Sequence, residues 1–374
     1  MEPFDLGLVL AGGALLVVGA TLLVQGASAI ALRLGVPPIV TGLTIVAFAT
    51  SSPELAVSLA AAATGRVELA AANIVGSNIL NVLLILGLAG LVAPLAVATR
   101  LVRLDVPLMV GLSIGVVAVG ILAGSIGRLA GLVLLGVMAT YVVLEVRGAM
   151  RADRPPPVDE IVVEGRPVTA ASLTGRPWLV DLGLIVGGLI GLVVGAAWLV
   201  DGATRIALGL GIPETVVGLT IVAIGTSAPE IATSVVATLR GEREIAVGNA
   251  VGSNIFNLAL VLGITAVVSP MAIPLDVATL GPDLLLMLGA AIACWPAFRS
   301  GMTFTRREAS AFLLVYLGYL AWVVLAVLDA PMAPVAGVAT LLVGIATLAW
   351  LARGALREPL GPRRGWPFRR PSRH

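Results

Sequence analysis

Long apolar stretches, each about the length needed to cross a lipid bilayer, follow one another along almost the whole chain. A membrane-spanning helix needs about 20 largely apolar residues. On that criterion the sequence predicts eleven spans, near residues 6–32, 37–64, 68–92, 104–123, 126–146, 178–208, 213–239, 244–268, 283–298, 308–328 and 333–352. The span at 283–298 is short and carries Pro296 near its end. We therefore expect an all-α polytopic membrane protein.

Polar segments divide this row of predicted helices into parts. The segment between the fifth and sixth spans is rich in arginine, proline and acidic residues, which is typical of a solvent loop. The expected parts are a first five-helix repeat at 1–147, a cytoplasmic loop at 148–177, a second repeat at 178–330, an extra transmembrane helix at 331–354 and a basic cytoplasmic tail at 355–374.

The composition excludes a water-soluble protein. Hydrophobic residues make up 59% of the 374 residues and charged residues 12%, with a mean hydropathy of +1.07. Soluble domains carry about 25% charged residues. The single histidine, His374, is the last residue, and Cys294 is the single cysteine. An internal catalytic histidine and a zinc or copper site built from these two residue types are therefore excluded.

Arginine placement predicts the orientation in the membrane. All 23 basic residues are arginines, and with the N-terminus outside and eleven spans, all but Arg66, Arg128 and Arg205 fall on the inner side. Inner loops of membrane proteins carry an excess of positive charge. We expect the N-terminus outside and the C-terminus in the cytoplasm. The same asymmetry explains the pI of about 9.2 without a nucleic-acid partner.

The chain contains an internal repeat. Residues 42–82 and 218–258 align without gaps at an offset of 176, with 23 identities in 41 positions that include TS-x-PE and VGSNI-x-N. Five predicted spans separate equivalent positions, and five is odd, so the second copy is expected to cross the membrane in the opposite direction. Inverted repeats are typical of secondary transporters, with a binding site near the midplane where interrupted helices meet.

Both copies carry a proline and polar side chains inside an apolar run. Pro53 removes one backbone N–H and predicts a break in the second span, beside Thr50, Ser51 and Glu54. The freed carbonyls around Ala47 need a partner in hydrocarbon. The equivalent residues of the second copy are Ala223, Thr226, Ser227, Pro229 and Glu230. The following spans add Ser77 with Asn81 and Ser253 with Asn257, each pair four residues apart on one helical face.

Glu54 and Glu230 are interpreted as the only acids deep inside their spans, with no arginine deep enough to pair with them. A bound cation offsets such buried charges, and a ligand set made only of oxygen suits calcium or sodium. A structural reading competes for the serines, threonines and GSN glycines, which often serve helix packing. Gln25 and Asp201 occupy equivalent positions, and their role is open between support of the site and helix-end solvation.

GLTIVAFATSSPE with NIVGSNILN, and GLTIVAIGTSAPE with NAVGSNIFN, resemble the two alpha-repeats of the cation/calcium exchanger superfamily, in its prokaryotic sodium/calcium exchanger branch. The resemblance covers both repeats and, more loosely, ten of the eleven spans. It implies that the two glutamates bind calcium and sodium alternately, with hydroxyl, amide and carbonyl oxygens around them. The implied ion ligands are Ala47, Thr50, Ser51, Glu54, Ser77, Asn81, Ala223, Thr226, Ser227, Glu230, Ser253 and Asn257.

Two departures from this family pattern bear on function. Several relatives carry an acid where this chain has Asn257, and an acid there accompanies potassium-dependent exchange, so we expect a potassium-independent exchanger. The eleventh span with its basic tail is absent from ten-span relatives, and no transport role is inferred for it.

These features predict an antiporter in the inner membrane of a prokaryote. Sodium moving inward is expected to drive calcium outward by alternating access, and the resemblance implies sliding of the first and sixth spans. Calcium/proton antiport at the same carboxylates is the nearest alternative, and a cation channel is the alternative from another class. An enzyme is not expected, because no nucleophile–base pair or pair of intramembrane aspartates is present. The expected partners are calcium, sodium and the lipid bilayer, with no cofactor; the oligomeric state is open.

Overall fold

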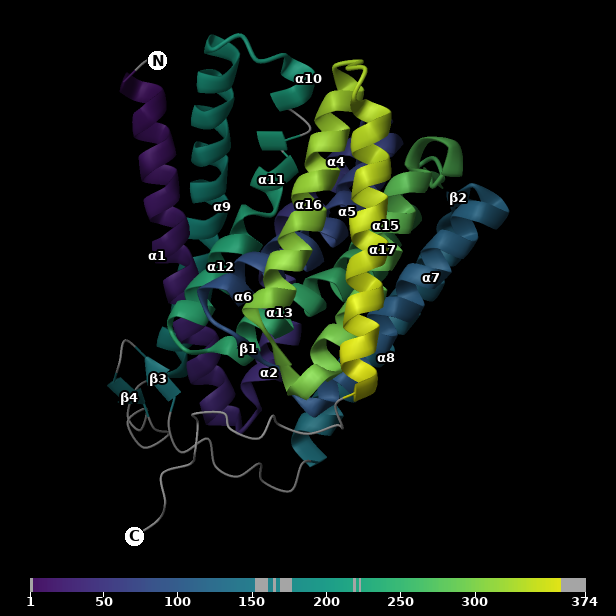
Figure 1. Cartoon of the computed structure of the whole chain (residues 1–374). Helices are drawn as coiled ribbons and strands as arrows, with labels where there is room; N and C mark the ends of the chain where they lie inside the picture. The colour runs from purple at the N-terminus through teal and green to yellow at the C-terminus, as the bar shows by residue number, and fades with distance from the viewer. Residues whose placement is uncertain are drawn as a thin grey trace.

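The protein is a bundle of long helices that stand side by side, as the computed structural model shows (Figure 1). The structure describes residues 3–151, 161–163, 166–168, 177–217, 220–221 and 223–357. Within these residues, ten helices are long and apolar enough to cross a membrane. The predicted all-α polytopic fold is therefore confirmed. The seventh predicted span, 213–239, contains residues outside the described ones, so the count of eleven stays a prediction.

The helices of the two halves follow the same order. The first half contains α1 (Pro3–Leu34), α2 (Pro38–Thr41), α3 (Ala47–Thr50), α4 (Ser52–Ala63), α5 (Val67–Leu80), α6 (Leu86–Val92), α7 (Val106–Ala123) and α8 (Arg128–Arg151). The second half contains α9 (Trp178–Gly209), α10 (Glu214–Val217), α11 (Ala223–Thr226), α12 (Ala228–Leu239), α13 (Arg243–Phe256), α14 (Leu262–Val268), α15 (Val277–Arg299) and α16 (Arg306–Val327). A last helix, α17 (Ala333–Arg357), follows them.

Short strands join the two halves at both ends of the bundle. Strand β1 (Leu95–Ala96) pairs antiparallel with β6 (Thr303–Phe304), and β2 (Ser125–Ile126) pairs antiparallel with β5 (Ile273–Pro274). The two ribbons lie at opposite ends of the helices (Figure 1). Helix α1 descends from the N-terminus in that view, whereas α9 ascends beside it. The second half therefore runs against the first, as the odd number of spans between the repeats predicts.

The predicted loop at 148–177 contains a hairpin that the composition did not indicate. Strand β3 (Ile161–Val163) pairs antiparallel with β4 (Arg166–Val168). The basic tail at 355–374 lies outside the described residues from residue 358 onward, so its expected role is not tested.

Helices α1 and α9 lie in backbone contact along a line of glycines, which we call the glycine seam. A Cβ atom on Gly19 would lie 2.7 Å from the Gly188 carbonyl oxygen, a distance that no real side chain allows. Small residues at such positions let membrane helices pack closely without side chains between them. The seam consists of Gly12, Gly19 and Gly26 on α1 and Gly188, Gly195 and Gly202 on α9.

Further acids are fully buried, but they lie near the ends of their spans, so the expectation that only Glu54 and Glu230 lie deep inside a span stays a prediction. Asp105, in the turn just before α7, and Glu145, on α8, are both fully buried. Arg100 donates to Glu145 Oε1, and the Tyr141 hydroxyl donates to Asp105 Oδ1 at 3.2 Å. These acids lie near the end of their spans, where an arginine side chain can reach back from the loop.

Helix α15 is longer than the predicted span at 283–298. It begins at Val277 and ends at Arg299, and it contains both Pro282 and Pro296. Each proline removes one backbone hydrogen bond, but packing against neighbouring helices makes this tolerable inside a membrane bundle. The additional residues lie at the start of the helix, before the predicted first residue 283, and they include Pro282.

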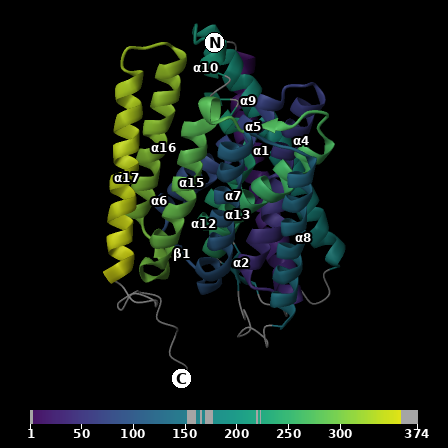
Figure 2. The same ribbon diagram turned by 90° about the vertical axis from the view of Figure 1, so that its right-hand side faces the viewer.

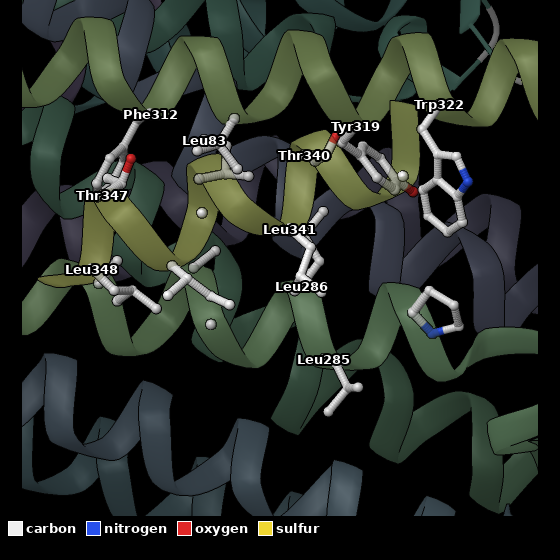
Figure 3. A pocket seen from close by; sticks show the side chains of 18 of the residues that line it. Leu83, Leu285, Leu286, Phe312, Tyr319, Trp322, Thr340, Leu341, Thr347 and Leu348 are labelled. Atoms are coloured by element: carbon white, nitrogen blue, oxygen red, sulfur yellow. The ribbon is translucent and has the colours of Figure 1, made fainter. Parts of the chain in front are cut away.

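Helix α17 packs on the outside of the bundle against α15 and α16 (Figures 1 and 2). A cavity of about 540 Å³ lies between these three helices. Its walls are mainly apolar, with Leu286, Phe312 and Leu341 among the lining side chains and Tyr319 and Trp322 at one end (Figure 3). None of the predicted ion ligands lines this cavity.

Candidate ion-binding site

The two predicted helix breaks are present, and each is made by a serine. Helix α3 ends at Thr50 and α4 begins at Ser52, with φ −79° and ψ 1° at Ser51 between them. Pro53 follows in the first turn of α4, where its missing N–H has no helical partner to lose. In the second half, Ser227 separates α11 from α12 with φ −94° and ψ 11°. The prolines thus start new helices rather than only bending old ones.

The two breaks meet in the interior of the bundle. Ser227 Oγ donates a hydrogen bond to Glu54 Oε1 at 2.9 Å, and its distance to Ser77 Oγ is 3.4 Å. The Glu54 and Glu230 carboxylates lie near enough for their charges to repel each other. Both glutamates have no exposed surface. Residues that lie 176 positions apart in sequence therefore form one site.

Many buried polar atoms of the predicted ligands have no hydrogen-bond partner among the described residues. Buried polar groups in proteins are nearly always paired, so a cluster of unpaired ones calls for an explanation. The unpaired atoms are Ser51 Oγ, Glu54 Oε2, both Glu230 carboxylate oxygens, Ser253 Oγ, and the amide oxygens and nitrogens of Asn81 and Asn257. Oxygen atoms gathered in this way suit a hard cation such as calcium or sodium.

The described part of the chain contains no group of three or more histidine, cysteine, aspartate or glutamate side chains that could hold a metal ion. Two carboxylates are therefore all the charged ligands that this site offers. Any ion bound here must also take hydroxyl, amide or backbone carbonyl oxygens.

The backbone carbonyls of the two predicted alanine ligands already accept hydrogen bonds. Ala47 O accepts from Ser51 N at 3.0 Å and from Thr50 Oγ1 at 3.4 Å. Ala223 O accepts from Thr226 Oγ1 at 3.0 Å. A carbonyl oxygen has two lone pairs, so an ion at Ala47 O would replace the longer bond from Thr50, whereas the bond from Thr226 uses one lone pair of Ala223 O. The ligand role of Ala47 and Ala223 stays a prediction.

Asp201 lies apart from these residues. Its carboxylate pairs with Arg205 at 3.0 Å, one turn further along α9, and both side chains are about half exposed. This contact favours helix-end solvation over support of the site.

Two asparagines that the sequence reading passed over hold the glutamates in place. Asn73 Nδ2 donates to Ser58 Oγ at 3.0 Å and to the Glu54 carbonyl oxygen at 3.3 Å. Asn249 Nδ2 repeats the arrangement with Ser234 Oγ at 2.9 Å and the Glu230 carbonyl oxygen at 3.4 Å. The signal was present, because both asparagines lie at matching positions of the aligned repeats.

A second feature that the sequence did not indicate is a π-helical turn that begins at each of the two asparagines predicted as ligands. The turns cover Asn81–Ile85 and Asn257–Val261. Single π turns inside α-helices are frequent at functional sites, because they alter the direction of side chains and free backbone groups. The two turns place the amides of Asn81 and Asn257 at equivalent points of the two halves.

A comparison with known proteins points to one family. The model of the family described as sodium/calcium exchanger protein matches residues 4–147 and 180–325. The inner membrane protein YrbG of Escherichia coli is 37% identical over 295 residues, which cover 77% of this chain and 88% of YrbG. The sodium/calcium exchanger MaX1 of Methanosarcina acetivorans is 30% identical over 296 residues, 71% of this chain and 83% of MaX1.

A solved structure has the same fold. The sodium-calcium exchanger NCX_Mj, soaked with Na⁺ and Ca²⁺, matches with a TM-score of 0.70 and 29% sequence identity. The match covers 86% of this chain and 99% of the NCX_Mj chain. The part of this chain without a counterpart is thus small.

Proposed function

Because this chain belongs to the sodium/calcium exchanger family, we propose that it exchanges calcium for sodium at the buried site between the two helix breaks. The observation that carries the proposal is the set of buried oxygens around Glu54 and Glu230 that lack a hydrogen-bond donor. Two carboxylates in a closed, low-dielectric interior repel each other strongly. A bound cation removes that repulsion at the least cost.

The charge of the site accounts for coupling between the two ions. A charge of about −2 is balanced by one calcium ion or by two or more monovalent cations, but not by both sets together. The two kinds of ion therefore compete for one site. An ion-free site is disfavoured in the closed state, since the carboxylates then lie unscreened in the interior. Such a protein exchanges ions rather than leaking them.

The ligand roles in this proposal follow the matching motifs of the two repeats. Glu54 and Glu230 supply the charge. Hydroxyl and amide oxygens complete the coordination, from Thr50, Ser51, Ser77, Asn81, Thr226, Ser227, Ser253 and Asn257, with the carbonyls of Ala47 and Ala223. Because Asn257 contributes an amide and not a third carboxylate, the site needs no additional potassium ion for charge balance.

The direction of transport rests on the orientation of the chain. Helix α1 carries Arg33 in its last turn, at the end of the bundle opposite the N-terminus; we call this end the basic side, because the sequence predicts most of the arginines there (Figure 1). By the positive-inside rule, the basic side faces the cytoplasm. Sodium then enters down its gradient from the side of the N-terminus, and calcium leaves by the same site in alternation.

The test is calcium-45 uptake into proteoliposomes that are loaded with sodium and diluted into sodium-free buffer. We expect uptake that requires the outward sodium gradient, persists with a protonophore, and is lost in Glu54→Gln. Glu68→Gln is the matched control, because Glu68 is an exposed glutamate in the first turn of α5. Uptake that follows a pH gradient and ignores sodium would assign the site to proton coupling. Calcium flux that needs no counter-ion would indicate a channel.

A further inference from the structure

Asn73 and Asn249 hold their own glutamates in the same way, but their amide oxygens have different surroundings. The Thr50 hydroxyl lies 3.1 Å from Asn249 Oδ1 and 3.4 Å from the Ala47 carbonyl oxygen; the shorter contact, in which Asn249 Oδ1 accepts, crosses from one half of the protein to the other. The equivalent bond would join Thr226 to Asn73. Thr226 Oγ1 donates instead to the Ala223 carbonyl oxygen, and no bond to Asn73 occurs among the described residues.

Burial follows the same division. Thr50 and Asn249 have no exposed surface, and Ala47 in the preceding turn has none either. Their counterparts are open to the surroundings: Thr226 and Asn73 are half-buried, and Ala223 is exposed. One half of a nearly symmetric site is therefore closed, and the other half is open.

The two halves face opposite sides of the membrane. The chain enters the membrane from the basic side after α1, through α2, and then reaches α3, which carries Thr50. Helix α11, which carries Thr226, follows from α10 at the side of the N-terminus (Figure 1). The structure thus has the site closed toward the basic side and open toward the other, with the Thr50–Asn249 bond in the closed part.

An amide oxygen needs a donor when water is excluded, and water can supply one when the site is open. Suppose that the second half takes the arrangement now seen in the first. Closing the N-terminal side would then remove water from Asn73 Oδ1 and bring the Thr226 hydroxyl within hydrogen-bonding distance of it. Opening the basic side would hydrate Asn249 Oδ1 and release Thr50. One hydrogen bond then replaces an equivalent one, so the exchange costs little free energy.

We propose that Asn249 and Asn73 act as alternating latches, with the Thr50–Asn249 bond closing the basic side and a Thr226–Asn73 bond closing the opposite side. The asparagines are positioning residues, because they bind the hydroxyl ligands and the glutamate carbonyls. This inference rests on the proposed exchange by alternating access. The inference specifies which hydrogen bond breaks and which one forms when the site changes from one side of the membrane to the other.

The test measures access to each half without any transport. Single cysteines replace Ala47 or Ala223 in a Cys294→Ala background, and a membrane-impermeant thiol reagent is applied from each side in the absence of sodium and calcium. We expect Asn249→Leu to raise labelling of position 47 from the basic side and to lower labelling of position 223. Asn73→Leu should shift labelling in the opposite direction. Loss of one net hydrogen bond changes the ratio of the two states by about twofold to tenfold.

Matched variants separate the latch from simple damage to the site. Ser58→Ala and Ser234→Ala remove the partner of each amide nitrogen but keep the threonine bond, so the labelling ratio should stay near that of the parent. Thr50→Val removes the donor of the same latch and should act like Asn249→Leu, which covers the case in which the leucine variant does not fold. Gel filtration in detergent establishes folding for each variant.

A shift in the same direction for both asparagine variants, or no shift in folded ones, overturns the latch. Calcium-45 exchange by the unaltered protein is measured separately. If that exchange is absent, the proposed function fails whatever the labelling shows. If exchange is present and the labelling ratios do not move, only the latch fails.

Discussion

Ser227 Oγ of the second half donates a hydrogen bond to the Glu54 carboxylate of the first half, at 2.9 Å. The serine stands at the break of one helix, and the glutamate follows the break of the other. The site therefore depends on contacts between the two halves, and neither half contains it alone.

Loss of this donor should weaken calcium binding more than folding. In Ser227→Ala, Glu54 Oε1 loses a hydrogen bond, and a proposed ion ligand is removed at the same time. We expect the apparent affinity for calcium to fall by about tenfold to a hundredfold, since a hydrogen bond to a charged group contributes about 1.5–3 kcal/mol. The measurement is the calcium dependence of sodium-driven uptake. Ser113→Ala is the control, because Ser113 is equally buried but donates to Met109 O away from the site; equal losses in both variants would contradict the role of Ser227.

Potassium should not affect transport by the unaltered protein. Asn257 is a fully buried amide, so the site carries two carboxylates and needs no third positive charge. We expect the same calcium uptake in potassium and in choline buffers of equal ionic strength. Asn257→Asp adds a negative charge and should make uptake depend on an additional monovalent cation. Potassium stimulation of the unaltered protein would contradict this reading of Asn257.

Acid conditions should stabilise the turn between α12 and α13. Burial, followed by the nearby charge of Glu244, raises the pKa of Glu242 to about 7, against smaller opposing effects of Ser28 and Arg240. The folded protein thus binds this proton more tightly than the unfolded chain does. The stabilisation is complete below the ordinary glutamate pKa and is lost as pH rises through about 7. The thermal unfolding midpoint in detergent should fall between about pH 5 and pH 8. Glu242→Gln, which stays neutral, should flatten this fall; an unchanged slope would exclude Glu242 as its source.

The glycine seam should tolerate no side chain. In Gly19→Ala, the new methyl group would lie 2.7 Å from the Gly188 carbonyl oxygen and from Leu192 N. The helices must separate, and overpacking of this kind costs about 1–3 kcal/mol. We expect a lower unfolding midpoint and slower exchange. Gly183→Ala on α9 is the control, because nothing lies within 4 Å of its added carbon. Its stability should be unchanged or higher, because alanine favours the helix.

Much of the architecture follows from patterns that one sequence carries. The apolar runs predict the helices. The aligned Pro53 and Pro229 predict two equivalent helix breaks, each beside a glutamate. These inferences succeed because a bilayer demands long helices and because a proline inside one has a defined effect. The direction of the second half needed only the parity of the spans between the repeats.

Other features depend on distances that no local pattern contains. Arg100 reaches Glu145 across 45 positions, so each looks like an isolated end-of-span charge in the sequence. Asn73 and Asn249 match in the alignment as well as the glutamates do, yet an asparagine in a small-residue segment indicates helix packing as readily as a site. The difference between the closed and open halves is invisible in the sequence, because the repeat makes both halves look alike there.

The glycine seam also has a mechanical consequence. Helices α1 and α9 have 32 residues each, which corresponds to a length of about 48 Å. Two helices of that length in backbone contact resist bending more than either helix alone and are expected to move as one rigid pair. A displacement at one end of the α1–α9 pair is then transmitted along the helices to the other end. We therefore expect a displacement of this helix pair at one membrane surface to be accompanied by a displacement at the other.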